Sequence, residues 1–248
     1  MSAPMTFACN QDAARAHGSS LQRLVSTSRL KALDLFCGAG GAGMGLHRAG
    51  YDVTGVDINR QPYYPFTFVQ GDALDADLMG YDLVWASPPC QAYTEMQRMH
   101  KNGAAHKDLV APIREKLKAW GGLYIIENVA NAPLQTHVML CGTMFGLRIA
   151  KHRYFEANFP LPLLMPPCDH RDIYDPWHGK GRTADKMREA QGTPWIPSGG
   201  GASRKRGETG DTNNAIPPAY SEFLASHAKR VTASANGKPS HAGLKAHE

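Results

Sequence analysis

The most constraining feature of the sequence is the alternation of short apolar runs with helix-like patterns in its central part. Short apolar runs bounded by turn residues are typical of buried strands, and longer stretches with apolar residues every three or four positions are typical of helices. We expect strands at Ala32–Phe36, Asp52–Asp57, Phe66–Gln70, Leu83–Ala86 and Leu123–Glu127, and helices at about 41–49 and 107–119. This alternation predicts an α/β fold with a mostly parallel sheet and helices on both of its faces.

The chain divides by composition into one main domain and an insertion. Its 248 residues are enough for a single sizeable core, but two domains would each be small. Prolines, glycines and basic residues dominate 156–210, which predicts a small, irregular, loop-rich region. We therefore expect a flexible segment at 1–30, a main domain at 31–155 and 211–228, and a flexible polar tail at 229–248.

Composition narrows the class of protein further. The sequence has no apolar run of about 18 residues, and its first residues lack the basic and apolar segments of a secretion signal, so we expect a soluble, cytoplasmic protein. Five cysteines without close pairing suggest reduced thiols rather than a disulfide framework. The formal charge of +5 suits a polyanionic partner without requiring one.

A glycine-rich loop follows the first expected strand. Asp34 and Phe36 precede the glycines of residues 38–45, which open the first expected helix. An acidic residue, Asp57, ends the second strand at about the offset where a carboxylate receives ribose hydroxyls. Asp72 follows the third strand, where it could bond an adenine edge. The pattern predicts a nucleotide-type cofactor site, although glycines at such turns also serve simply to let a helix and a strand pack closely.

Two further reactive groups follow later strands. The Pro88-Pro89 pair ends the strand at Ala86 and presents Cys90 at the edge where open α/β sheets bind ligands. A thiol there can attack an electrophilic carbon once it is ionised, or it can be an inert buried cysteine. Glu127 ends a β-branched strand at the same edge, either as a functional acid or as the partner of a nearby basic residue.

Four motifs in order resemble one family closely. They are Asp-Leu-Phe-Cys-Gly-Ala-Gly-Gly at 34–41, Pro-Pro-Cys-Gln-Ala-Tyr-Thr at 88–94, Glu-Asn-Val at 127–129 and Asn-Asn-Ala-Ile-Pro-Pro at 213–218. Together they resemble the cytosine-5 DNA methyltransferases, in particular compact bacterial or bacteriophage members, over about residues 32–228. Several motifs in the right order are much more specific than any one of them.

The resemblance implies a Rossmann-like fold that depends on S-adenosylmethionine, with a main catalytic domain and a target-recognition region at 156–210. It implies that Cys90 adds to C6 of a cytosine, that Glu127 holds N3 and the exocyclic amine, and that Arg153 holds O2. Methyl transfer to C5 would then proceed through a covalent adduct. The cofactor residues that it implies are Asp34, Phe36, Gly38, Ala39, Gly40, Gly41, Asp57, Ile58, Asp72, Ala73, Pro88, Asn214 and Ala215.

The implied substrate is double-stranded DNA with the target base flipped into a pocket. The polar segment from Gln91 to about His106 suits a loop that closes over that base. Expected DNA contacts are Gln91, Gln97, Arg98, Lys101, Lys151, Arg182, Arg204, Lys205 and Arg206. Basic runs of this kind are also common on solvated surfaces. Lys151 stands where the family usually has an arginine. We expect a monomer, and the residues leave open whether a cognate restriction enzyme exists.

Other interpretations remain open. Relatives with the same Ser-Pro-Pro-Cys-Gln motif methylate cytosine in transfer RNA, amino-methyltransferases carry an aromatic residue where this chain has Cys90, and a nucleic-acid-binding module without turnover would share the fold. Cys168 and His170 with His178 lack the paired-cysteine spacing of structural zinc, so we expect no metal site. Trp177 and Trp195 suit a small satellite core better than base stacking.

Overall fold

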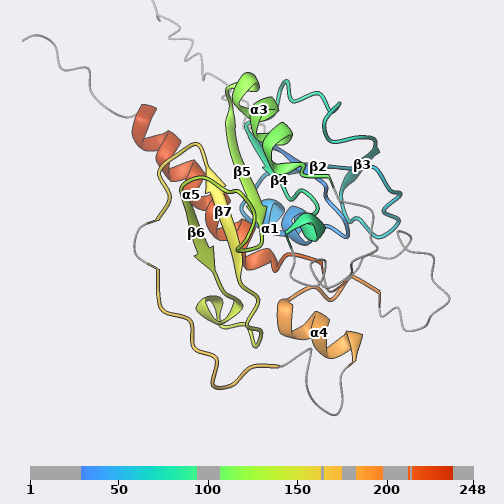
Figure 1. The fold of residues 1–248 in the computed structure, drawn as a ribbon, viewed down its shortest axis with the longest axis vertical. Coiled ribbons are helices and arrows are strands. Elements are labelled where there is room, and N and C mark those ends of the chain that lie inside the picture. The colour runs from blue at the N-terminus through green and yellow to red at the C-terminus, as the bar shows by residue number, and fades with distance from the viewer. Residues whose placement is uncertain are drawn as a thin grey trace, which may run out of the picture.

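The computed structural model describes residues 29–93, 107–162, 165–174, 183–197, 212 and 214–236. Within this part of the chain, seven strands form one sheet in the order β3-β2-β1-β4-β5-β7-β6 (Figure 1). The strands are β1 (Lys31–Leu35), β2 (Asp52–Asp57), β3 (Thr67–Gln70), β4 (Leu83–Ala86), β5 (Leu123–Asn128), β6 (His137–Leu140) and β7 (Arg153–Ala157). The first five are parallel, and β7 runs antiparallel to both β5 and β6.

Helices cover both faces of the sheet (Figure 1). Helices α1 (Gly41–Arg48) and α5 (Pro218–Asn236) pack on one face, and α3 (Val110–Trp120) packs on the other. The expected α/β fold class, a Rossmann-like and mostly parallel sheet between two helical layers, is therefore confirmed.

Strand β4 shows why the sequence adopts this layered arrangement. All four of its side chains are buried, and alternate side chains of a strand point to opposite faces. Trp85 joins the core under α5, where Tyr220 packs, whereas Val84 joins the core under α3, where Ile113 packs. A continuous apolar run is what a strand covered on both faces requires.

A buried ion pair ties α3 to β7. The Arg114 guanidinium donates to both carboxylate oxygens of Glu156 at 2.7 Å each, and also to the Pro133 carbonyl at 2.6 Å. The Gln135 amide donates to the same carboxylate at 2.6 Å. Since both charges have several partners, the pair is well compensated in the core.

Apart from shifts of one to three residues at the ends of expected elements, the structure contains features that the sequence did not predict. The antiparallel strands β6 and β7 were not expected, and the irregular region at 156–210 contains a helix, α4 (Ala184–Gln191), which Thr183 caps by accepting from the Lys186 amide at 3.2 Å. Helix α5 continues to Asn236, past the tail boundary expected after residue 228. Early in this extension the Lys229 ammonium donates to the Ala49 carbonyl at 2.5 Å. In the part of the chain that is described, no helix is both long and apolar enough to span a membrane.

Candidate active site

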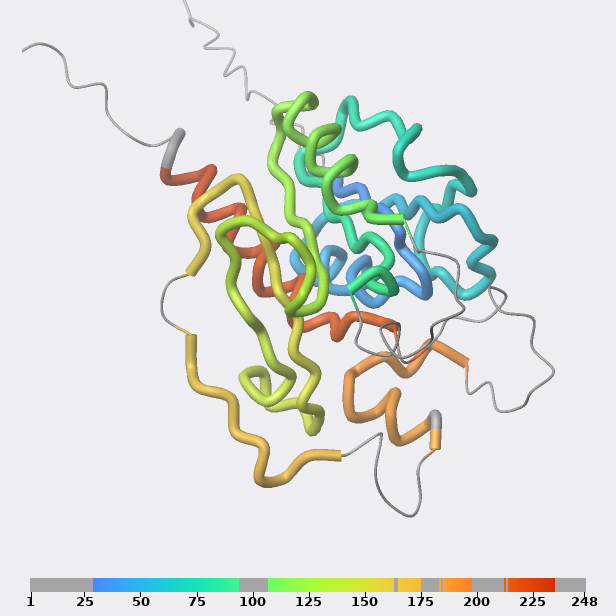
Figure 2. Tube along the Cα trace, viewed as in Figure 1, coloured from blue at the N-terminus to red at the C-terminus, as the bar shows by residue number. Residues whose placement is uncertain are grey.

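One cavity of about 570 Å³ lies where β1, β2, β4 and β5 end and β7 begins. The segment before α5 contributes Asn214, Ala215 and Ile216 to its lining, and this segment runs between α4 and α1 in the view of Figure 2. Most of the residues expected to bind cofactor or substrate line this cavity: Asp34, Phe36, Gly38, Ala39, Gly41, Asp57, Ile58, Pro88, Cys90, Gln91, Glu127, Arg153, Asn214 and Ala215. Parallel strands bring their carboxyl ends to one edge, which explains why motifs far apart in sequence meet here.

The glycine-rich loop turns sharply at the end of β1. Phe36 has a left-handed φ of +58°, which is uncommon for a residue with a side chain, and Gly40 begins α1 with a φ of +81°. The Gly38 amide donates to Asp57 Oδ2 at 3.0 Å, so the end of β2 holds the loop in place. At Gly41 a methyl group would lie 2.3 Å from the Ile216 carbonyl oxygen, so only glycine permits this close approach.

Asp34 is a buried carboxylate in the wall of the cavity. Its Oδ2 accepts from the Tyr64 hydroxyl at 3.1 Å, whereas its Oδ1 has no hydrogen-bond partner among the described residues. Burial raises the pKa of this carboxyl well above its usual range, although the Tyr64 hydrogen bond opposes the rise. A buried acceptor without a partner is costly in a folded protein, and a ligand that donates a hydrogen bond or carries positive charge would satisfy it.

Cys90 follows the Pro-Pro turn after β4 and is the first residue of a short 3-10 helix, η1 (Cys90–Ala92). Asn128, at the end of β5, donates its side-chain amide to the Pro88 carbonyl at 2.9 Å and so fixes the turn. The thiol is half-buried. Burial raises its pKa, the Arg153 charge opposes that rise, and Glu127 adds to it. Burial therefore favours the protonated thiol in the resting protein.

Glu127 and Arg153 form an ion pair beside the thiol. Because β7 runs antiparallel to β5, its first residue lies next to the last residues of β5, and Arg153 Nε is 3.1 Å from Glu127 Oε1. Burial raises the pKa of the Glu127 carboxyl, although Arg153 and a hydrogen bond from Ser87 lower it in part. The sequence left open whether Glu127 serves as an acid or pairs with a basic residue; it is paired, and both partners face the cavity.

The structure corrects the interpretation of Lys151. This residue was expected to contact DNA phosphates, but it is buried, and its ammonium donates to the Ala215 carbonyl at 2.5 Å and to Gln191 Oε1 at 3.3 Å. The Tyr220 hydroxyl donates to the Lys151 carbonyl at 2.5 Å. Lys151 therefore joins the segment just before β7 to α4, through Gln191, and to the segment before α5, through Ala215. The sequence could not reveal this, because the two acceptors come from distant parts of the chain.

Other expected site residues lie elsewhere. Gly40 does not line the cavity and instead caps α1, Asp72 is exposed and accepts from the Leu74 amide at 2.9 Å, and Ala73 is packed in the core beneath α3. Trp195 joins the small core of Ala39, Ile196 and Ala215, as expected, and its indole donates to the Ala39 carbonyl at 2.9 Å. Some expected residues lie outside the described part of the chain: Gln97, Arg98, Lys101, Trp177, His178, Arg182, Arg204, Lys205 and Arg206.

Sequence reasoning missed two supporting residues and one cluster. Ser87 hydrogen-bonds Glu127 and accepts from the Trp85 indole at 2.8 Å, and Asn128 fixes the turn that carries Cys90. Ser87 belongs to the Ser-Pro-Pro-Cys-Gln motif and Asn128 to the Glu-Asn-Val motif, but neither had been assigned a role. The cluster consists of Cys141, His152, Cys168 and His170, whose ligand atoms all lie within 4.8 Å of one another. The expectation of no metal site considered only Cys168, His170 and His178, because Cys141 and His152 lie in other segments of the chain.

The chain resembles a curated protein only over a short stretch, and it matches no family model. Over 79 residues the chain is 34% identical to a protein of Pyrococcus horikoshii named 23S rRNA (uracil(747)-C(5))-methyltransferase. The match covers 27% of this chain and only 19% of that protein. The chain therefore spans about a fifth of the length of this curated relative.

Solved structures similar to the chain are distant. A structure described as a DNA modification methyltransferase encoded within an E. coli prophage has a TM-score of 0.41 and 19% identity, over 51% of this chain and 45% of its own. A Spodoptera frugiperda DNMT2 variant has a TM-score of 0.41 and 17% identity, over 64% and 59%. The S. pombe Dnmt2 methyltransferase has 0.40 and 16%, over 64% and 60%. The chain thus spans between 45% and 60% of the length of each of these proteins.

Proposed function

We propose that this protein is an S-adenosylmethionine-dependent methyltransferase that transfers a methyl group to C5 of a flipped-out cytosine in double-stranded DNA. One observation carries the proposal: a half-buried thiol, Cys90, shares one cavity with the Glu127–Arg153 pair and with the acidic, glycine-rich edge at Asp34. A nucleophile, an acid and a cofactor-type loop in one pocket are the parts that this reaction requires.

The residues at the glycine-rich edge fit the proposed cofactor. Asp34 Oδ1 is buried without a partner among the described residues, which suits a ligand with a positive charge or a hydrogen-bond donor. Asp57, held by the Gly38 amide, has its carboxylate at the cavity wall, where it would receive hydroxyl groups. When bound, S-adenosylmethionine supplies an electrophilic methyl group on a sulfonium.

Cys90 performs the covalent step. C5 of cytosine is a poor nucleophile. Once the Cys90 thiol has lost its proton to solvent, addition of the thiolate to C6 turns the ring into an enamine with electron density at C5. Once C5 has taken the methyl group, a base removes the proton from C5, and the electron pair of that C–H bond re-forms the C5–C6 double bond as the sulfur leaves C6. The net products are 5-methylcytosine, the demethylated cofactor and one proton, and the thiolate is regenerated.

Glu127 and Arg153 hold the base during this addition. Because burial raises the pKa of Glu127, its carboxylate takes up a proton more readily than an exposed one. In the protonated form it would donate to cytosine N3, which withdraws electrons from C6 as the thiolate attacks. The Arg153 guanidinium, already at the cavity wall, would donate to O2 of the base. Its charge also favours the thiolate form of Cys90, so one cation serves both groups.

A second candidate substrate is RNA. The curated relative is named as a ribosomal RNA methyltransferase that acts at a pyrimidine C5, and a pocket for a flipped pyrimidine would serve either nucleic acid. The Ser-Pro-Pro-Cys-Gln motif also occurs in relatives that methylate RNA, and DNA is preferred here because the four motifs taken together and in order resemble the DNA enzymes. A binding module without turnover would need neither the thiol nor the acid in the cavity.

The test is methyl incorporation from labelled S-adenosylmethionine into matched DNA duplexes and RNA hairpins, with 5-methylcytosine identified by mass spectrometry. We expect product in DNA, no product with Cys90→Ser, and a large loss of rate with Glu127→Gln. Glu115→Gln, the same change on the exposed side of α3, should behave like the parent. Methylation of RNA alone would reassign the substrate, methylation at a nitrogen would exclude the covalent route, and binding without product would exclude an enzyme.

A further inference from the structure

We propose that Cys141, His152, Cys168 and His170 bind a structural zinc ion that holds the region after β7 against the catalytic core. The four residues offer two sulfur and two nitrogen ligands, and all four ligand atoms lie within 4.8 Å of one another. Tetrahedral sets of two cysteines and two histidines are a common structural zinc site.

Two of the sulfur–nitrogen distances between ligand atoms already match those around a tetrahedral zinc ion. Cys141 Sγ lies 3.3 Å from His170 Nε2, and Cys168 Sγ lies 3.7 Å from His152 Nε2. Zinc bonds of about 2.3 Å to sulfur and 2.0–2.1 Å to nitrogen place neighbouring ligands of a tetrahedron roughly 3.3–3.8 Å apart. The other ligand atoms lie within 4.8 Å of one another, so those distances need to shorten by no more than about 1.5 Å, which side-chain rotation can supply.

The ligands come from three separate segments, which explains why their spacing gave no signal. Cys141 follows β6 and begins the 3-10 helix η2 (Gly142–Phe145), His152 directly precedes β7, and Cys168 and His170 lie in the segment 165–174. A supporting contact already joins the first and last of these, because Thr143 Oγ1 accepts from the Asp169 amide at 3.2 Å. Zinc sites commonly have such outer contacts to orient their ligands.

Two simpler arrangements could bring these side chains together. Each cysteine could donate a weak hydrogen bond to its nearby histidine, or Cys141 and Cys168 could form a disulfide; the structure has both as free thiols. Separate hydrogen bonds would not require the two pairs to meet, yet the imidazole rings of His152 and His170 are also only 5.1 Å apart between centroids. Convergence of all four ligand atoms on one point is what a shared ion explains.

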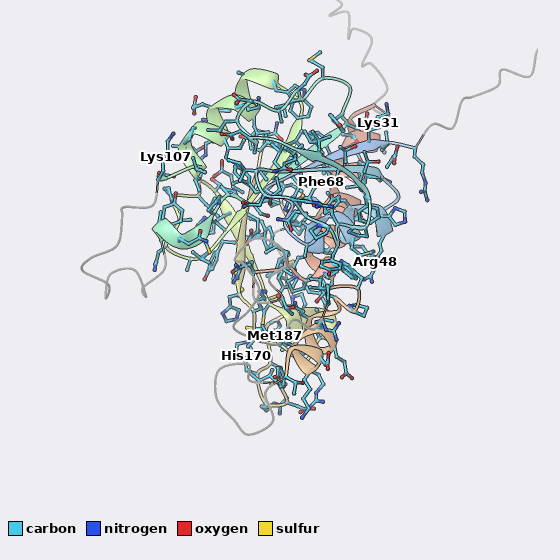
Figure 3. All side chains as sticks on the ribbon, turned by 90° about the vertical axis from the view of Figure 1, so that its right-hand side faces the viewer. Lys31, Arg48, Phe68, Lys107, His170 and Met187 are labelled. Atoms are coloured by element: carbon cyan, nitrogen blue, oxygen red, sulfur yellow. The ribbon has the colours of Figure 1, made fainter. Side chains whose placement is uncertain are left out.

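The position of the cluster indicates what the ion would stabilise. His170 lies in the narrow lobe that also contains Met187 of α4, away from Lys31 at the start of the sheet (Figure 3). His152 is the residue before Arg153, and the Arg153 guanidinium donates to the His152 carbonyl at 2.8 Å. Zinc bound at His152 would therefore fix the backbone that presents Arg153 to the cavity. We regard the four ligands as positioning residues, not catalytic ones.

The test is the metal content of the full chain, purified from zinc-replete medium without chelator and measured by inductively coupled plasma mass spectrometry. We expect about one zinc per chain in the parent and at least a tenfold lower content in Cys168→Ser and in His170→Ala. Replacement with Co²⁺ should give the visible absorption of a tetrahedral cobalt thiolate, and Cys168→Ser should lose it. His170 is exposed, so its variant remains informative if Cys168→Ser folds poorly.

Matched variants separate this inference from the proposed function. Cys90→Ser removes the proposed nucleophile and His137→Ala removes an exposed histidine of β6, and both should keep the zinc of the parent. An excess of EDTA should lower the melting temperature of the parent but not that of Cys168→Ser. A folded parent without zinc, a Cys168→Ser variant with the full zinc content, or a Cys141–Cys168 disulfide in the intact protein would each overturn the proposal, whatever the methylation assay shows.

Discussion

Replacing Lys151 with methionine tests whether this lysine joins structural elements or binds DNA. Methionine keeps the apolar stem but removes the ammonium that donates to Ala215 and Gln191. Gln191 cannot turn to replace that donor, because its own amide nitrogen already donates to Thr193 Oγ1 at 2.9 Å and to the Thr212 carbonyl at 2.8 Å. The variant therefore leaves two buried acceptors unpaired.

Each unpaired buried acceptor costs about 1–3 kcal/mol, so the two together cost about 2–6 kcal/mol. Removing a buried charge also removes its desolvation cost, so we expect the lower part of this range, about 2–3 kcal/mol. For a chain of this size, that loss lowers the melting temperature by roughly 4–12 °C. The assays are urea unfolding and thermal unfolding monitored by circular dichroism.

The control is Lys186→Met, which removes an exposed ammonium from α4 and should change stability by no more than about 0.5 kcal/mol. DNA affinity measured against salt concentration supplies the second readout. A lysine that contacts one phosphate contributes about 0.9 to the slope of log K against log salt, and we expect Lys151→Met to leave this slope unchanged. A variant as stable as the parent, with a slope reduced by about one, would refute the structural role.

Three further predictions follow from buried ionisable groups. Glu156→Gln leaves the buried Arg114 guanidinium uncompensated and should lower the free energy of unfolding in urea by about 3–5 kcal/mol. Glu115→Gln, in an exposed pair, should lower it by less than about 1 kcal/mol. Equal losses would contradict the burial argument. Because the pKa of Asp34 is raised in the folded state, the folded protein loses stability as pH rises above the ordinary carboxyl range. Asp34→Asn should therefore unfold at a higher urea concentration than the parent at neutral pH, but not in acid. The same variant should lose cofactor binding. A urea midpoint at neutral pH that does not exceed that of the parent would count against the buried carboxylate. Alkylation of Cys90 by iodoacetamide, followed by mass spectrometry, should rise at a higher pH than for a free thiol, and at a still higher pH in Arg153→Ala. A midpoint at or below that of a free thiol would contradict the raised pKa.

The sequence predicted the centre of the fold well because local pattern and burial agree there. Strands β2 and β4 begin and end where expected, and the cavity collects the strand ends that carry Asp34, Cys90 and Glu127. Parallel topology alone places those ends at one edge, so the order of the motifs was enough to predict their meeting.

Features that depend on contacts between distant segments could not be predicted. The sequence predicts a surface position for Lys151. Its partners are the side-chain amide of Gln191, 40 positions away, and the carbonyl of Ala215, 64 positions away. The antiparallel pair β6 and β7 has short strands with partly exposed residues and therefore gives no strong apolar run. The cysteine and histidine cluster likewise forms only when three separate segments meet.

The central claim is that the Cys90 sulfur forms a transient bond to cytosine C6. A duplex in which the target cytosine carries fluorine at C5 traps that bond, because the fluorine replaces the proton whose loss releases the enzyme. With S-adenosylmethionine present, we expect a complex that survives denaturing electrophoresis and that peptide mapping places on Cys90, with none in Cys90→Ser. Transfer of methyl groups to unmodified duplex without any such adduct, or an adduct on another residue, would contradict the account.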